Sequence, residues 1–134
     1  MKNKVQYKSN TDGIEVVVEP EYIDSQTTNN SNFVWAYHIV IENKSDDTIQ
    51  LINRYWRIID ENGLTQEIRG VGAVGEQPIL KPNDNFKYSS GVHLRCPSGV
   101  MSGHYGMKQS DGKIINVQIP TFSLDVPDIK SVIN

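Results

Sequence analysis

The residues branched at Cβ set the strongest limit on how this chain can fold. Val, Ile and Thr together make up 34 of the 134 residues, whereas Ala and Leu make up only 7. Branching at Cβ crowds the turns of a helix but fits the pleated surface of a sheet, and Ala and Leu are leading helix formers. The chain is therefore predicted to consist mostly of β-strands.

The segment Phe33–Asn43 shows the clearest two-residue alternation in the chain. One face carries only large apolar side chains, namely Phe33, Trp35, Tyr37, Ile39 and Ile41. The other face is also mostly apolar and consists of Val34, Ala36, His38 and Val40. A strand covered on both faces lies inside a sheet. This strand is therefore predicted to be central, with His38 as a half-buried strand residue.

A second long strand is predicted over Ile49–Asp60, but its register is ambiguous. The apolar residues Ile52, Trp56 and Ile58 favour an even register facing the core. Arg54 falls in that same register and interrupts the apolar stripe. The sequence thus predicts the strand and leaves open which of its residues face inward.

Turn signals divide the rest of the chain into short strands. Asn62-Gly63 is the strongest hairpin signal, because this pair tolerates the positive φ of a tight turn. The polar segment Asp24–Asn32 has no periodicity and predicts a loop. About eight closely spaced strands without a long helix indicate an all-β fold. We expect an antiparallel two-sheet β-sandwich, with residues 1–134 forming a single domain.

Charge and cysteine content argue against several classes of partner. The formal net charge is −3, so neither nucleic acid nor a membrane is expected as a partner. The apolar runs are too short for a membrane span or a signal peptide, which predicts a cytoplasmic protein. Cys96 is the single cysteine, so neither a disulfide nor a thiolate metal cage is expected, and no cofactor is predicted.

Glycines, prolines and aromatic residues follow one another in a distinctive order between Arg54 and Met107. They include Trp56, Gly70, Gly72, Gly75, Pro78, Pro82, Phe86, Tyr88, Gly91, Pro97, Gly99, Gly103 and Tyr105. This order resembles the bacterial ApaG family, and the resemblance continues through Ile119-Pro120-Thr121-Phe122 over nearly the whole chain. The resemblance implies a β-sandwich similar to fibronectin type III domains.

The resemblance implies less about activity than about fold. Bacterial members of the family are associated with cobalt resistance and magnesium efflux, without a settled biochemical activity. The same domain is attached to some eukaryotic F-box proteins and to a polymerase-interacting protein, where it is thought to bind partners. By this resemblance we expect a binding role rather than a defined reaction.

The glycines at Gly70, Gly72 and Gly75 have the spacing of a dinucleotide-binding fingerprint. Pro78 and Pro82 prevent the helix that this fingerprint requires, which excludes a Rossmann unit. Successive N–H groups in such a loop can still bind an anion without a helix, and the neighbouring Arg69 would add positive charge. The other interpretation is structural, since glycines permit positive φ and close packing.

Residues suited to metal or nucleophilic chemistry do not cluster along the sequence. No two of the histidines His38, His93 and His104 lie within four residues of each other, so zinc-ligand spacing is missing. Cys96 and Ser102 are near histidines but not in the motif that exposes a nucleophile on a sharp strand-to-helix turn. Neither a catalytic site nor a metal site is predicted.

The sequence therefore predicts a non-catalytic module that binds an unidentified protein partner and supports cobalt and magnesium homeostasis indirectly. The candidate contact loop carries Arg69, Gly70, Gly72 and Gly75. The alternative is a pyrophosphate-binding or nucleotide-binding protein, or a hydrolase of such a ligand, that uses the same loop. Edge strands of a sandwich need covering, and a symmetric homodimer would cover one of them.

Overall fold

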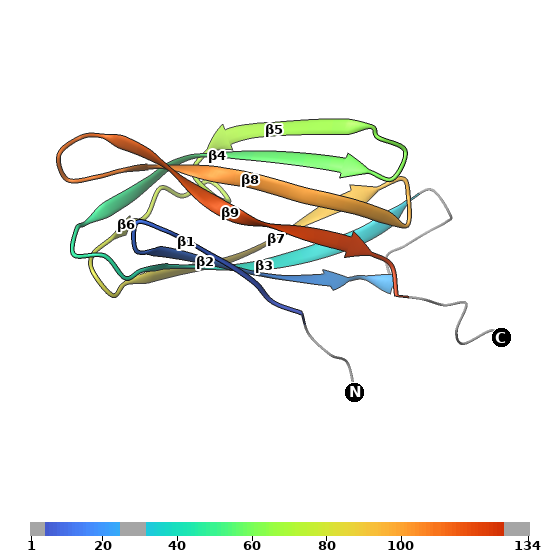
Figure 1. Ribbon diagram of the computed structural model, residues 1–134, viewed down its shortest axis with the longest axis horizontal. Coiled ribbons are helices and arrows are strands. Elements are labelled where there is room, and N and C mark those ends of the chain that lie inside the picture. Colours follow the sequence, from blue (N-terminus) through green and yellow to red (C-terminus); the bar gives the residue numbers. More distant parts are fainter. Residues whose placement is uncertain (1–4, 25–31, 128–134) are drawn as a thin grey trace.

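The computed structural model describes residues 5–24 and 32–127, and its long elements are all strands. They form two antiparallel sheets packed face to face (Figure 1). The first sheet has the order β1(Tyr7–Thr11), β2(Ile14–Tyr22), β3(Phe33–Asn43), β7(Asn85–Leu94). The second has the order β5(Thr65–Val71), β4(Ile49–Asp60), β8(Ser98–Lys108), β9(Ile114–Asp125), and the short β6(Ile79–Leu80) pairs with β4. The predicted antiparallel sandwich is confirmed.

Strand β3 has the predicted bounds and the predicted central place, between β2 and β7. Its outward face is less covered than expected, because Ala36 and Val40 are only half-buried, whereas His38 is half-buried as predicted. The loop predicted over Asp24–Asn32 lies mostly outside the described residues, which omit 25–31. Within the described residues, no helix has the length and apolar character needed to cross a membrane.

Strand β1 is an element that the sequence did not predict. Its residues, Tyr7–Thr11, are mostly polar and lack the apolar alternation that marks a strand. The segment becomes a strand through backbone pairing with β2, whose own apolar alternation is strong, in a register from Tyr7↔Val18 to Thr11↔Ile14. Its strand character therefore comes from its neighbour and not from its own side chains.

A β-bulge explains why the register of β4 was ambiguous. Ile49 and Leu51 face the core at odd positions, whereas Trp56 and Ile58 face it at even positions. The pairing with β8 shifts between Leu51 and Asn53, which places Ile52 at the irregularity. An extra residue in one strand switches the face on which all later side chains lie. The expectation that Ile52 points inward was wrong for this reason, and the residue is only half-buried.

The core between the sheets is organised around aromatic rings. Trp56 and Tyr105 are almost fully buried, and Trp56 faces the core as its even register predicts. Trp56 meets Tyr37 edge-on with 5.2 Å between ring centroids, and it meets Phe122 in a T-shaped arrangement at 5.9 Å. The Tyr88 and Tyr105 hydroxyls are 2.6 Å apart and share one hydrogen bond across the two sheets. Burial raises the pKa of both phenols above the usual tyrosine value.

We expect the free energy of unfolding to fall as pH rises above about 10, the pKa of tyrosine in an unfolded chain. Tyr88 and Tyr105 keep their protons in the folded protein because their folded pKa values are raised. The unfolded chain then binds fewer protons than the folded chain, so increasing pH favours unfolding. Urea titrations across neutral and alkaline pH measure this, and Tyr105→Phe should reduce the slope. A stability that stays constant through the tyrosine range would contradict it.

The two lateral sides of the sandwich differ. On one side, Ser9 of β1 donates a hydrogen bond to the Gln118 carbonyl of β9, at 2.7 Å. The Gln118 N–H in turn donates to the Thr11 hydroxyl, at 3.1 Å. The edge strands β1 and β9 are thus joined across the sheets. On the other side, β7 ends one sheet and β5 ends the other, and no described strand pairs with their outer edges.

Candidate functional site

The glycine loop that the sequence singled out forms a tight hairpin after β5. Ala73 and Glu76 pair with each other through both backbone hydrogen bonds, each at 2.9 Å. The two residues between them, Val74 and Gly75, have φ values of 46° and 80°. Positive φ at both central positions is the pattern of a type I′ turn, and it is unusual for a branched residue such as Val74.

The N–H groups at the start of this loop are donated to the protein's own carbonyls. Gly72 donates to the carbonyl of Ile52 at 2.8 Å, and the Gln77 side chain donates to the same oxygen at 2.9 Å. The Ala73 N–H donates to the Glu76 carbonyl within the turn itself. Ile52 is the residue at the β4 bulge. The loop therefore satisfies the backbone of an irregular strand, which is the structural interpretation of these glycines.

Arg54, and not Arg69, lies against the glycine loop. Its Nη1 donates to the carbonyls of Val71 and Gly72, both at 3.1 Å. A Cβ placed on Gly70 would collide with the Arg54 guanidinium, so only the absence of a side chain at this position leaves room for that guanidinium. Sequence reasoning missed Arg54 because it is sixteen residues from Gly70 in the chain and becomes its neighbour only through β4–β5 pairing.

Arg69 lies on the outer face of the second sheet. Its guanidinium carbon sits 4.5 Å from the centre of the Tyr55 ring, and the side chain is 73% exposed. Tyr55 also contacts the His104 ring at a centroid distance of 5.1 Å. The Tyr55 hydroxyl donates to Glu67 at 2.8 Å, and this hydrogen bond raises the pKa of the phenol. The structure thus places Arg69 in an exposed row of stacked side chains.

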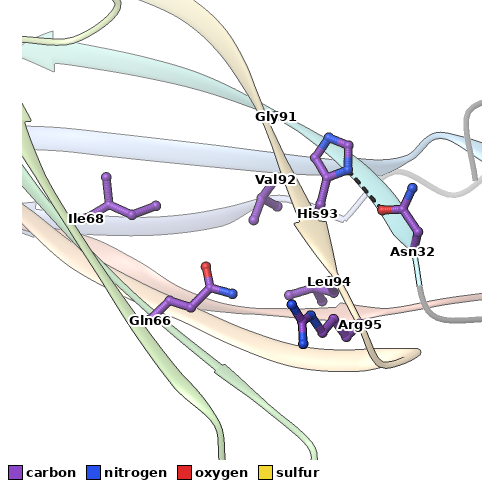
Figure 2. Close-up of a pocket in the computed structure, with 8 residues that line it drawn as sticks. All are labelled: Asn32, Gln66, Ile68, Gly91, Val92, His93, Leu94 and Arg95. Carbon is purple, nitrogen blue, oxygen red and sulfur yellow. Dashed lines mark hydrogen bonds between the residues drawn. The ribbon is translucent and has the colours of Figure 1, made fainter.

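A cavity of about 540 Å³ opens on the side of the sandwich where no described strand pairs with the outer edges of β5 and β7. Figure 2 shows Gln66 and Ile68 of β5 facing Val92 and Leu94 of β7 across this opening. The described lining also includes Asn32, Gly91, His93 and Arg95. We call this space the lateral opening. No sequence motif pointed to it, because its two walls come from different sheets.

A half-buried guanidinium, that of Arg54, lies beside the lining residue Ile68, although Arg54 is not itself one of the residues that line the lateral opening. Gly70 follows Ile68 on the same face of β5, and the Arg54 guanidinium lies directly over Gly70. Arg54 is close enough to Tyr88 and Tyr105 for its charge to oppose the rise in their pKa values. Among the described residues, no carboxylate forms an ion pair with Arg54.

Tertiary pairing also assembles a serine, a histidine and a glutamate, which the sequence did not predict. The two ring nitrogens of His38 lie 2.6 Å from Ser89 Oγ and 2.8 Å from Glu21 Oε1. The same three residue types activate a serine in hydrolases. Here they stand on the outer face of the first sheet, with the His38 side chain 39% exposed. His38 and Ser89 are direct cross-strand partners, so their contact follows from the sheet register alone.

The remaining candidate residues stay apart. His93 contacts Asn32 at 3.0 Å between Nδ1 and Oδ1, and His104 stacks on Tyr55. Cys96 is buried, accepts a hydrogen bond from the Asn62 side chain at 3.2 Å, and has its thiol pKa raised by loss of solvent contact. In the described parts of the chain, no group of three or more His, Cys, Asp or Glu residues could hold a metal ion.

Comparison with known proteins gives a consistent answer. Residues 23–109 match the ApaG domain. The chain is 50% identical to Protein ApaG of Sinorhizobium fredii and 49% identical to Protein ApaG of Agrobacterium fabrum, in each case over 96% of this chain and 99% of the relative. A crystal structure of a protein named ApaA from Bordetella pertussis superposes with a TM-score of 0.83 at 35% identity, covering 92% of this chain and 98% of that one. The chain therefore belongs to the ApaG family.

Proposed function

We propose that this protein is a non-catalytic module that binds a protein partner at the lateral opening. One observation carries the proposal: the opening lies between two strand edges that no described strand covers, and it is lined by apolar side chains, polar side chains and Arg95. Unpaired edges offer free backbone donors and acceptors to another chain. Strand addition at such an edge is a recurring mode of protein recognition.

The proposal that the module is non-catalytic rests on where the reactive groups lie. Ser89, His38 and Glu21 occupy an exposed sheet surface, and none of them lines the lateral opening. A hydrolase needs an enclosed position for the reacting carbonyl and donors for the oxyanion, in addition to a nucleophile and a base. The hydrogen bonds that join Ser89, His38 and Glu21 are better explained as a cross-strand polar contact that stabilises the outer face of the sheet.

The association with cobalt and magnesium implied by the family resemblance would act through the partner. Among the described residues there is no ligand cluster for a cation, so we assign the chain an indirect role. The pyrophosphate alternative has weaker support, because the Gly72 and Ala73 N–H groups are donated to carbonyls of the protein. An anion at this loop would have to displace those hydrogen bonds, whose loss leaves buried groups unpaired.

The tagged 134-residue chain should capture a discrete protein from a bacterial lysate in a saturable manner. Ile68→Glu, which places a charge in the lateral opening, should reduce capture, whereas Gly75→Asp in the glycine loop should not. Gly75 suits this comparison better than Gly72, because a Cβ on Gly75 would meet nothing within 4 Å, whereas one on Gly72 would collide with the Glu76 carbonyl. The φ of 80° at Gly75 strains any residue with a side chain, and Asp is chosen because it tolerates positive φ better than most. Mass spectrometry of the eluted proteins measures the difference.

Two results would overturn the proposed function. One is the absence of any protein enriched above a tag-only control. The other is covalent labelling of Ser89 by a serine-reactive fluorophosphonate that disappears in His38→Ala, because such labelling requires an activated nucleophile. Unchanged thermal melting of each variant shows that the fold is intact.

A further inference from the structure

The wall of the lateral opening formed by β7 is well suited to receive another strand. Val92 and Leu94 point into the opening and are buried, at 8% and 2% exposure, so this end of β7 is firmly held. The opposite wall, β5, is exposed along nearly its whole length. A rigid edge binds an incoming strand with a smaller loss of conformational freedom than a loosely held one. The favoured edge is therefore that of β7.

The spacing of the apolar side chains fits an extended occupant. Val92 and Leu94 are two residues apart on β7, and Ile68, which is 40% exposed, faces them from β5. Alternate side chains of an extended segment also repeat every two residues on one face. A segment lying along β7 could thus place successive apolar side chains between the two sheets.

The charges around the lateral opening favour an acidic occupant. None of the described residues that line it is acidic, although the chain as a whole has a net charge of −3. Arg95 is the cationic residue of the described lining, and the Arg54 guanidinium lies just beyond that lining, over Gly70, which follows Ile68 on the same face of β5. Only Nη1 of Arg54 is engaged, with two backbone carbonyls, and no described carboxylate neutralises the group. A guanidinium in this state can accept a carboxylate through charge-assisted hydrogen bonds.

We infer that the occupant of the lateral opening is an extended segment of a partner protein that carries an Asp or Glu side chain. Its backbone adds to the free edge of β7, its apolar side chains contact Ile68, Val92 and Leu94, and its carboxylate binds Arg54. From Gln66 to Gly70 the strand rise is about 13 Å, so five or six residues of the partner would span the site. This inference rests on the proposed protein-binding function and specifies its ligand.

The test is a selection of displayed random octapeptides on the 134-residue chain, with removal of peptides that also bind Ile68→Glu. We expect the selected peptides to contain an acidic residue beside alternating apolar positions. Arg54→Gln should weaken their binding by about tenfold, as expected for loss of a charge-assisted hydrogen bond. The matched control is Arg57→Gln on the exposed outer face of the same strand, which should leave binding unchanged.

Amide chemical shifts map where a selected peptide binds. The largest changes should fall on β7 between Ser90 and Leu94 and on Ile68. Thermal melting of each variant, measured without peptide, shows whether Arg54→Gln disturbs the loop that it contacts. If that variant melts early, Arg95→Gln provides the second charge test, with the same expected direction.

Several results would overturn the inference. They are failure of any peptide to be enriched, enriched peptides without carboxylates, equal binding to Ile68→Glu, or shift changes centred on Gly72–Gly75. A concentration-dependent dimer that Ile68→Glu abolishes would mean that a second copy of the chain occupies the opening instead. If lysate capture persists unchanged with Ile68→Glu, the protein-binding function stands and only this site fails. If the unmodified chain captures nothing, the proposed function itself fails.

Discussion

Trp56→Ala should lower the free energy of unfolding by about 4 kcal/mol, within the usual range for deleting a buried aromatic side chain. The indole is 1% exposed and contacts the rings of Tyr37 and Phe122, so the sheets cannot close over the space left behind without moving both. Domains of this size have roughly 5–15 kcal/mol of stability in total. The variant should therefore unfold at a much lower urea concentration, as measured by circular dichroism.

The conservative change Trp56→Phe is the control for this prediction. In the described structure, the Trp56 Nε1 has no hydrogen-bond partner although it is buried. Phenylalanine would remove that unpaired donor and keep most of the apolar contact, and burying an unpaired donor is itself unfavourable. We expect Trp56→Phe to cost less than half as much as Trp56→Ala. Equal losses for the two variants would contradict this account of the core.

Gly103→Ala should destabilise the protein by about 3 kcal/mol, at the upper end of the usual cost of overpacking. A Cβ on Gly103 would collide with the backbone carbonyl of Tyr55 on the neighbouring strand β4. Backbone cannot rotate away as a side chain can, so either β4 or β8 must shift. Gly103 also adjoins the register irregularity after Met101, which leaves little freedom to absorb that shift.

Gly91→Ala is the matched control for Gly103→Ala. Both glycines lie in strands, but a Cβ on Gly91 would lie 3.3 Å from its nearest neighbour, the Trp35 carbonyl, so a small adjustment accommodates it. We expect a cost below about 1 kcal/mol for this variant in parallel urea titrations. A loss of stability in Gly103→Ala that is no larger than the small loss expected for Gly91→Ala would show that the β4–β8 contact is not as close as described.

These two predictions concern the scaffold, and the scaffold determines the candidate site. Trp56 and Gly103 are register partners at the centre of the second sheet. β4 carries Arg54 two residues before Trp56, and the same strand holds β5 in place as one wall of the lateral opening. A change that displaces β4 would therefore move the guanidinium and one wall of the opening together. Binding tests on such variants report on folding and not on recognition.

Local features of the sequence predicted the elements that local chemistry controls. Strict alternation in Phe33–Asn43 predicted β3 with its bounds, because a side-chain period of two residues belongs to a strand whatever its neighbours are. Asn62-Gly63 predicted the turn between β4 and β5, and Gly63 indeed has a φ of 82°. Each of these signals is contained within a few consecutive residues.

The candidate site could not be predicted in the same way. The sequence placed Arg69 beside the glycine loop, but adjacent residues of a strand point to opposite faces, and Arg69 lies outside against Tyr55. The cation that reaches the loop is Arg54, which strand pairing brings from β4. The row formed by Ser89, His38 and Glu21 was missed for the same reason, since its members come from three strands.

The sequence by itself determined that this chain forms strands, where several of them turn, and which apolar residues could build a core, because branching, alternation and turn propensity act between near neighbours. Only the tertiary structure decided how the strands pair. It made a strand of the polar Tyr7–Thr11 segment, switched the face of β4 at Ile52, and left the outer edges of β5 and β7 without a partner among the described strands. Pairing and sheet packing depend on contacts between residues far apart in the chain, and such contacts leave no local pattern in the sequence.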